Sequence, residues 1–281
     1  MTVLSGATWL AWRNNRQAAV IGGVLALGAG AALVVVAILE IAQPTGSVHT
    51  MSTAFQPLLI GAPAVAGVFM GAPLLSADFE RGTHLLTWTQ GMTRRHWAAA
   101  NLSLLIALSA LAAAVMSVGA QIWIAHLPNT FNSTWGMYDL QAPVVFSYVL
   151  FAVALGAAAG AALRRTIPAM AATLGIFIAV RVAFVELARP HLLPTITRVV
   201  VGGTGANSVV PPGAGYVDAT FLDSHLNPLP PGSPLGGNTP ISLVYQPATH
   251  FWPMQGIEAG IFVVLALALL VAALRFTTRD A

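Results

Sequence analysis

Few residues in this sequence could do chemistry, and one of them is an arginine inside an apolar run. Arg181 lies within the run 167–187, and Glu186 follows it five residues later. If the run crosses lipid, Arg181 is expected to be shielded by protein or water, because an isolated charge in hydrocarbon is costly. A spacing of five residues is poor for a pair on one helix face. Glu40 and Glu258, at the ends of other apolar runs, are alternative partners.

A second set of charged residues follows the apolar run 57–77. The segment 78–97 begins with acidic residues, turns at a glycine, continues as a short and partly apolar stretch, and turns again before the next apolar run. A surface helix between two turns can present a lever to a partner, although an ordinary interfacial linker has the same pattern. The residues we expect to contact a partner are Asp78, Glu80, Arg81, Gly82, Thr83, Leu85, Leu86, Trp88 and Arg94.

Motifs of enzymes and nucleotide-binding proteins are absent from the sequence. It contains neither H-E-x-x-H nor G-x-S-x-G. All twelve Lys+Arg residues are arginines. Without a lysine there can be no G-x-x-x-x-G-K-[ST] loop for ATP. We expect no metal site and no cofactor in this chain, since its five histidines in expected outer loops lack the i, i+4 ligand spacing: His49, His126, His191, His225 and His250.

The composition is that of a membrane protein. Hydrophobic residues make up 57% of the 281 residues and charged residues only 7%, whereas soluble domains carry roughly 25% charged residues. A chain of this length can provide about six helices of roughly 20 residues each. The absence of cysteine excludes disulfides and thiolate metal sites.

The order of apolar runs predicts an all-α membrane protein, with residues 1–281 forming a single transmembrane domain. Segment 1–17 is expected to be an interfacial helix, because its tryptophans and arginines fall on different faces. A long Gly- and Pro-rich outer loop is expected at 188–255, partly packed on the helices. The six expected spans are 18–39, 57–77, 98–125, 142–163, 167–187 and 256–274.

Arginine positions predict the orientation of these spans. Arginines precede the first span, lie between spans two and three and between spans four and five, and follow span six. The opposite side has only Arg189 and Arg198, both in the long loop. The positive-inside rule therefore places both termini of this multi-pass protein in the cytoplasm and the spans in the cell membrane. The basic pI follows from these arginines and does not indicate a nucleic-acid partner.

Two glycine motifs predict close helix packing. Gly67 and Gly71 lie in the second expected span, and Gly156 and Gly160 lie in the fourth. In membranes a small residue at every fourth position lets two helix backbones approach each other. Pro63 and Pro73, on either side of the first motif, are expected to begin or bend the second span.

The segment 78–97 and the residues after it resemble the cytoplasmic segment of ABC exporter permeases of the type-two family, especially those of actinobacteria. The resemblance covers about a tenth of the chain. Asn101 stands where that family has a basic residue. The matching positions are Asp78, Glu80, Gly82, Thr83, Trp88, Thr89, Gln90, Thr93 and Arg94.

The resemblance implies that segment 78–97 is a coupling helix that docks on a separate ATP-binding subunit. ATP and Mg²⁺ would then be bound in that partner chain, and a second permease copy, identical or different, would complete the transporter. It further implies export or flipping of a substrate, and an amphipathic substrate would suit apolar spans. A non-transporting scaffold or sensor and an intramembrane enzyme remain alternatives with the same topology.

Overall fold

The computed structural model describes residues 60–82, 93–126, 133–201 and 211–279, with gaps at 212, 231 and 234–237, and the single residues Gly28, Val35 and Ile38. The expected interfacial helix 1–17 and most of the first expected span lie outside the described residues. Within them, five helical stretches are long and apolar enough to cross a membrane. The prediction of a helical membrane fold is confirmed.

These five stretches are built from seven main helical elements. The first comprises α3 (Ala62–Ala66), the π-helix η1 (Gly67–Gly71) and α4 (Ala72–Arg81). The others are formed by α6 (Arg94–His126), α8 (Val144–Leu163), α9 (Thr166–Ala183) and α10 (Phe251–Arg279). Short elements α7 (Ser133–Gly136) and η2 (Tyr138–Leu140) connect α6 to α8.

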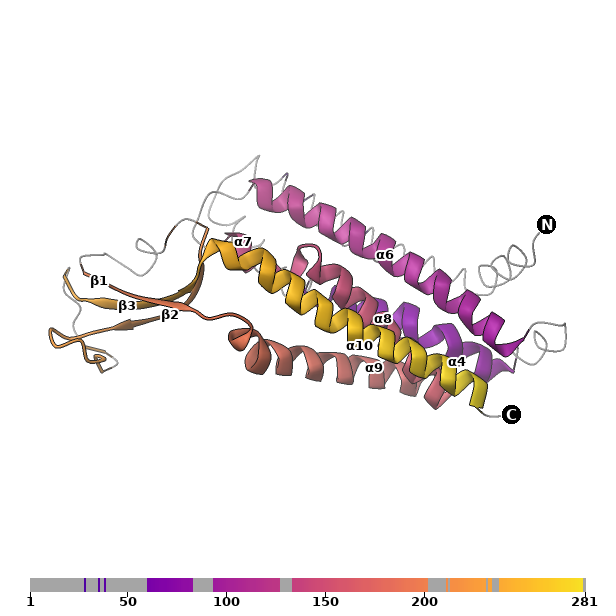
Figure 1. Ribbon diagram of the computed structural model, residues 1–281. Helices are drawn as coiled ribbons and strands as arrows, with labels where there is room; N and C mark the ends of the chain where they lie inside the picture. The colour runs from indigo at the N-terminus through magenta and orange to yellow at the C-terminus, as the bar shows by residue number, and fades with distance from the viewer. Residues whose placement is uncertain are drawn as a thin grey trace.

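Helix α8 lies at the centre of the bundle. About 83% of its apolar window is buried, against 22% for the span that contains α9. It packs against α10, α4, η1, α6 and α9, and Figure 1 shows α8 between these helices. An apolar helix with a low hydrophobic asymmetry is expected in such a central position, because it can bury its whole circumference.

The two glycine motifs pack against each other. A Cβ on Gly156 would lie 2.4 Å from the backbone oxygen of Gly67, and one on Gly160 would lie 2.5 Å from the backbone oxygen of Ala72. A Cβ on Gly71 would lie 2.5 Å from the oxygen of Val153. The α8 backbone therefore touches the η1–α4 backbone, as small residues allow. The π-helical turn η1 lies directly before Pro73, which cannot donate a backbone hydrogen bond.

Exposed arginines gather at one end of the bundle. Arg81 ends α4, Arg95 lies in the first turn of α6, and Arg275 is close to the end of α10. Arg164 and Arg165 form the turn between α8 and α9. Figure 1 places the ends of α4 and α10 at the end of the bundle opposite the β-strands. Helix α4 extends four residues beyond the expected end of span two and stops at Gly82, whose φ of 70° suits glycine.

The segment expected as the long outer loop 188–255 contains regular structure. After the π-helix η3 (Phe184–Ala188) and the 3₁₀ turn η4 (Arg189–His191), three strands form an antiparallel sheet in the order β1-β3-β2. The strands are β1 (Ile196–Val200), β2 (Gly215–Phe221) and β3 (Ile241–Gln246). Alternating burial of Ile241, Leu243 and Tyr245 follows the two-residue period of a strand.

The last span begins earlier than expected. The 3₁₀ turn η6 (Ala248–His250) leads into α10, which starts at Phe251 instead of Gly256 and continues past Leu274 to Arg279. Pro253 lies in the first turn of α10, where its missing N–H leaves no helical hydrogen bond unmade. The early start brings Gln255 into the helix, one turn before Glu258 on the same face.

Trp135 attaches the sheet to the bundle. Its indole Nε1 donates to the backbone oxygen of Gly213, at 3.0 Å. A Cβ on Gly215, the first residue of β2, would lie 2.5 Å from the Trp135 ring. On the bundle side, the Trp135 ring stacks on Tyr138 and meets Phe251 edge-on.

Candidate functional site

The end of α4 is fixed to the start of α9 by one carboxylate. Glu80 Oε2 accepts a hydrogen bond from the Thr166 backbone nitrogen at 3.0 Å and another from the Thr166 hydroxyl at 2.7 Å. Thr166 is the first residue of α9, whose first-turn N–H groups have no partner within the helix. An acidic side chain at this position satisfies one of these groups and complements the helix dipole. Glu80 is therefore the N-terminal cap of a helix remote in sequence.

Further contacts support this α4–α9 junction. The Ser76 hydroxyl, one turn before Glu80, lies 3.2 Å from the Thr166 hydroxyl. The guanidinium of Arg164 lies 5.3 Å from the centre of the Phe79 ring, and that ring meets Trp97 of α6 edge-on at 6.0 Å. The last turn of α4 is thus held to three other parts of the bundle: the α8–α9 turn, α9 and α6.

The expected coupling segment is described only at its two ends. Asp78, Glu80 and Arg81 occupy the last turn of α4, with Asp78 half-buried and the other two exposed. Gly82 ends that helix and Arg94 begins α6. The remaining predicted residues, Thr83, Leu85, Leu86 and Trp88, lie outside the described residues. The described ends place the segment at the arginine-rich end of the bundle.

At the opposite end, where the sheet is attached, Arg181 lies in a cluster of charged side chains. Its Nη2 is 3.1 Å from Asp139 Oδ2, and its Nη1 is 3.6 Å from Glu258 Oε1. The Nη1 also donates to the Tyr148 hydroxyl at 2.9 Å, with the guanidinium over the Tyr148 ring. Arg181 is only 8% exposed and Glu258 is fully buried. The expected shielding of Arg181 is therefore observed.

A second arginine completes the cluster. Arg189, in η4, contacts Asp139 Oδ1 and lies 2.9 Å from Glu258 Oε1. It also donates to the Tyr148 hydroxyl at 3.0 Å, and that hydroxyl donates to Glu258. We call Asp139, Tyr148, Arg181, Arg189 and Glu258 the charge cluster. Its formal charge is balanced, and each arginine contacts both carboxylates.

Gln255 holds the backbone that carries part of the cluster. Its Oε1 accepts from the Val144 nitrogen at the start of α8, at 3.2 Å, and its Nε2 donates to the Tyr138 oxygen at 2.8 Å. Gln255 is fully buried. One face of α10 therefore positions η2, which carries Asp139, and also supplies Glu258.

One of the acidic residues considered from the sequence as a partner of Arg181 contacts it. Glu186 lies in the π-helix η3 and is exposed, whereas the alternative partner Glu258 contacts Arg181. Glu40 lies outside the described residues. Asp139 and Arg189 were not predicted from the sequence. Their signal was position alone: Asp139 lies just before the apolar run 142–163, and Arg189 lies just after the run 167–187 that holds Arg181.

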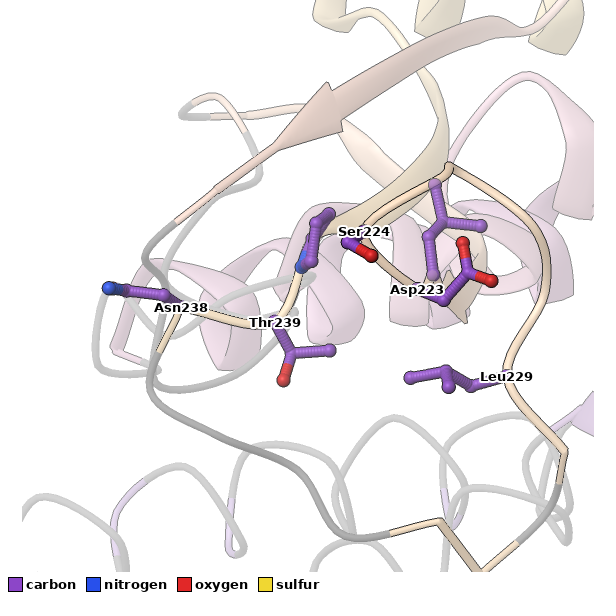
Figure 2. Close-up of a pocket in the computed structure, with 7 residues that line it drawn as sticks. Asp223, Ser224, Leu229, Asn238 and Thr239 are labelled. Carbon is purple, nitrogen blue, oxygen red and sulfur yellow. The ribbon is translucent and has the colours of Figure 1, made fainter.

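A shallow hollow in the segment between β2 and β3 is a weaker candidate. Figure 2 shows Asp223, Ser224, Leu229 and Thr239 around it, with the Asn238 side chain directed away from Asp223. Backbone N–H groups of Asn227 and His225 donate to the Asp223 carboxylate and hold the pKa of Asp223 below its ordinary value. Because its carboxylate already closes the local turn, the residue has a structural role here.

Comparison with known families gives one match. The family described as ABC-2 membrane transporter related matches residues 40–189, which is more than half of the 281 residues. The matched region includes the last turn of α4, the α4–α9 junction, Asp139, Tyr148, Arg181 and Arg189. Searches of curated proteins and of solved structures gave no match.

Proposed function

Because the chain belongs to the family of ABC-2 membrane transporter related proteins, we propose that it is the membrane subunit of an ATP-driven transporter that exports or flips an amphipathic substrate. The family membership makes it a multi-pass permease of the cell membrane. The direction of transport, the class of substrate and the ATP-binding partner are our proposals. Transport is favoured over a scaffold or an enzyme because the family is one of transport subunits.

Energy for transport would come from a separate ATP-binding subunit. The sequence has no lysine and therefore no Walker loop for ATP phosphates. ATP and Mg²⁺ would be bound by that partner. The segment between α4 and α6 would be its docking site, with Leu85, Leu86 and Trp88 filling an apolar groove and Glu80 and Arg81 near charges on the partner. This assignment rests on the sequence pattern and its resemblance to permeases.

The observation that carries the mechanism is the cap formed by Glu80 on Thr166. A push on the coupling segment reaches the last turn of α4 directly, and Glu80 connects that turn to the start of α9. The glycine contacts connect the other end of the same span to α8. One docking event could therefore displace α4 and α9 together, which is what a transporter needs to change the exposure of its central surfaces.

Orientation and assembly complete the proposal. We propose that the coupling end lies in the cytoplasm and the sheet outside, since exposed arginines gather at the coupling end and the positive-inside rule favours this orientation. A second permease copy, identical or different, would form the rest of the pathway. The exposed apolar side chains of α9 would then face lipid or that copy.

Reconstitution tests the proposal. The chain would be purified with a candidate ATP-binding subunit, first any ATPase whose reading frame is found beside its gene, and placed in proteoliposomes with an NBD-labelled phospholipid and, separately, ethidium. We expect ATP-dependent movement of at least one probe and hydrolysis that depends on the permease. If the two proteins associate and hydrolyse ATP but move neither probe, the proposed substrate class is wrong. If they do not associate, the transporter assignment is wrong.

A further inference from the structure

We propose that the charge cluster is a latch that holds the sheet end of the transporter closed and opens to water during ATP turnover. This proposal rests on the proposed transport function and assigns a role to Asp139, Arg181, Arg189 and Glu258 within it. The cluster joins five elements that meet near the base of the sheet: η2, α8, α9, η4 and α10.

The first argument is the closed arrangement of the contacts. Arg181 and Arg189 each touch both Asp139 and Glu258, so the four charges form a ring. The Tyr148 hydroxyl contacts both arginines and both carboxylates from within the ring. Displacing any one of the four charged side chains therefore breaks two ion pairs at once.

The second argument is that the ring is largely buried. Glu258 has no exposed surface and Arg181 is 8% exposed, while the side chains of Asp139 and Arg189 are 15% and 20% exposed. The attraction between opposite charges is strong in a poorly polarisable interior and weak in water. Entry of water would therefore weaken every pair of the ring together, and its removal would strengthen them together. We propose two states on this basis, one closed and largely shielded from water and the other open and hydrated.

The third argument is that stability alone does not explain these residues. Buried ion pairs are often matched or exceeded in stability by apolar side chains of similar size. An ion pair weakens when water enters, because water screens the two charges. A contact between apolar side chains has no charges to screen. Tyr138 adds a reserve donor, because its buried hydroxyl has no hydrogen-bond partner among the described residues. It can bind water or a carboxylate once the ring opens.

The position of α9 connects the latch to the coupling segment. The span that contains α9 is the least buried of the five described spans. Its first residue is capped by Glu80, and its last turn carries Arg181. Displacement of the coupling segment therefore reaches the cluster along one helix. The π-helix η3 lies between Arg181 and Arg189, and π-helical turns inside helices are frequent at functional sites.

A single thiol can report opening of the latch. The sequence has no cysteine, so Val185→Cys provides a unique label site. Val185 is half-buried and lies four residues from both Arg181 and Arg189. A membrane-impermeant maleimide would be added on the sheet side of proteoliposomes that contain the ATP-binding subunit. We expect labelling to be about tenfold faster during ATP turnover than without nucleotide, the rate ratio of a barrier lowered by 1.36 kcal/mol.

Two variants then test the charges themselves. Asp139→Leu with Arg189→Met removes one charge of each sign and leaves Arg181 with Glu258 as the one ion pair of the ring that water can weaken. We expect it to bind the ATP-binding subunit and unfold at the same or a higher temperature, yet show a smaller turnover-dependent rise in labelling and slower transport of the NBD-labelled phospholipid or ethidium. Glu258→Gln should act in the opposite direction, because it unbalances the ring and raises labelling without nucleotide.

The outcomes separate the latch from the transport function. If the Val185→Cys chain transports a probe but its labelling rate is the same with and without ATP turnover, the latch is overturned. Transport at the parental rate by the Asp139→Leu, Arg189→Met variant would do the same. If that variant does not insert, unchanged resting labelling in Glu258→Gln overturns the latch independently. If the parent and the Val185→Cys chain both hydrolyse ATP with the partner but move neither probe, the proposed substrate class is overturned, and the labelling rates alone decide the latch.

Discussion

Glu80, the penultimate residue of α4, accepts two hydrogen bonds from Thr166, the first residue of α9, across 86 positions of sequence. If this cap transmits motion, Glu80→Ala should spare membrane insertion and binding of the ATP-binding subunit but separate ATP hydrolysis from transport. Thr166→Val, which removes the hydroxyl donor, should have a weaker effect of the same kind. Parallel assays of binding, hydrolysis and transport would measure it.

The variant Glu80→Gln distinguishes the cap from a salt bridge with the partner. A glutamine oxygen can still accept from Thr166 but carries no charge. Coupling retained in Glu80→Gln and lost in Glu80→Ala would support the cap. Equal loss in both would assign the carboxylate to a charge on the ATP-binding subunit. Normal coupling in both would remove Glu80 from the mechanism.

Gly156→Ala should destabilise the bundle. The added Cβ would lie 2.4 Å from the Gly67 oxygen and 2.6 Å from the Ala72 nitrogen, both backbone atoms that cannot turn aside. Overpacking of this kind costs about 1–3 kcal/mol. Thermal unfolding in detergent should show a lowered midpoint. Gly175→Ala is the matched control, because its Cβ would meet nothing within 4 Å. Equal midpoints for the two variants would contradict the close contact.

Arg181→Leu should be strongly destabilising, because it leaves two carboxylates with one guanidinium. Removing one partner of a buried ion pair costs about 3–5 kcal/mol. Adding Glu258→Gln restores the charge balance, so the double variant should be more stable than Arg181→Leu alone. Unfolding free energies of the four chains give the coupling. If the effects of the two substitutions on the unfolding free energy simply add, the shared ring is contradicted. Glu186→Gln, at an exposed position, is the control and should change stability by no more than about 0.5 kcal/mol.

Trp135 should control how firmly the sheet is attached. Trp135→Phe keeps an aromatic ring but loses the hydrogen bond to Gly213, which is worth about 0.5–1.5 kcal/mol. Trp135→Ala also loses the ring contacts with Tyr138 and Phe251. Hydrogen exchange of β3 amides should accelerate slightly in the first variant and more in the second, while exchange in α8 stays constant. Unchanged β3 exchange in Trp135→Ala would show that the sheet is held elsewhere.

The sequence was sufficient for features that depend on local pattern. Apolar length predicted the helices, and small residues at every fourth position predicted close packing at Gly67, Gly71, Gly156 and Gly160. It could not identify which helix each motif contacts, because that depends on the relative register of two distant segments. The mutual packing of η1 and α8 became evident only from the structure.

The charge cluster was predicted only in part for the same reason. Arg181 was recognisable because a charge within an apolar run is unusual. Asp139 follows no local pattern, and its position depends on how η2 is held by Gln255. The strands were also missed, since glycines and prolines dominate 188–255. The alternation of apolar and polar residues at the start of β3 was a strand signal that could have been used.

Binding of the ATP-binding subunit to the purified permease tests the central claim most directly, with Trp88→Ala as the variant. Truncating an aromatic anchor at an interface often costs about 2 kcal/mol, which weakens binding roughly thirtyfold. Trp252→Ala is the matched control, because Trp252 is 63% exposed and lies at the sheet end of α10. We predict tight binding by the parent and the control, and roughly thirtyfold weaker binding by Trp88→Ala. Equal affinities for all three chains, or no binding by the parent, would contradict a permease that docks its ATPase through segment 78–97.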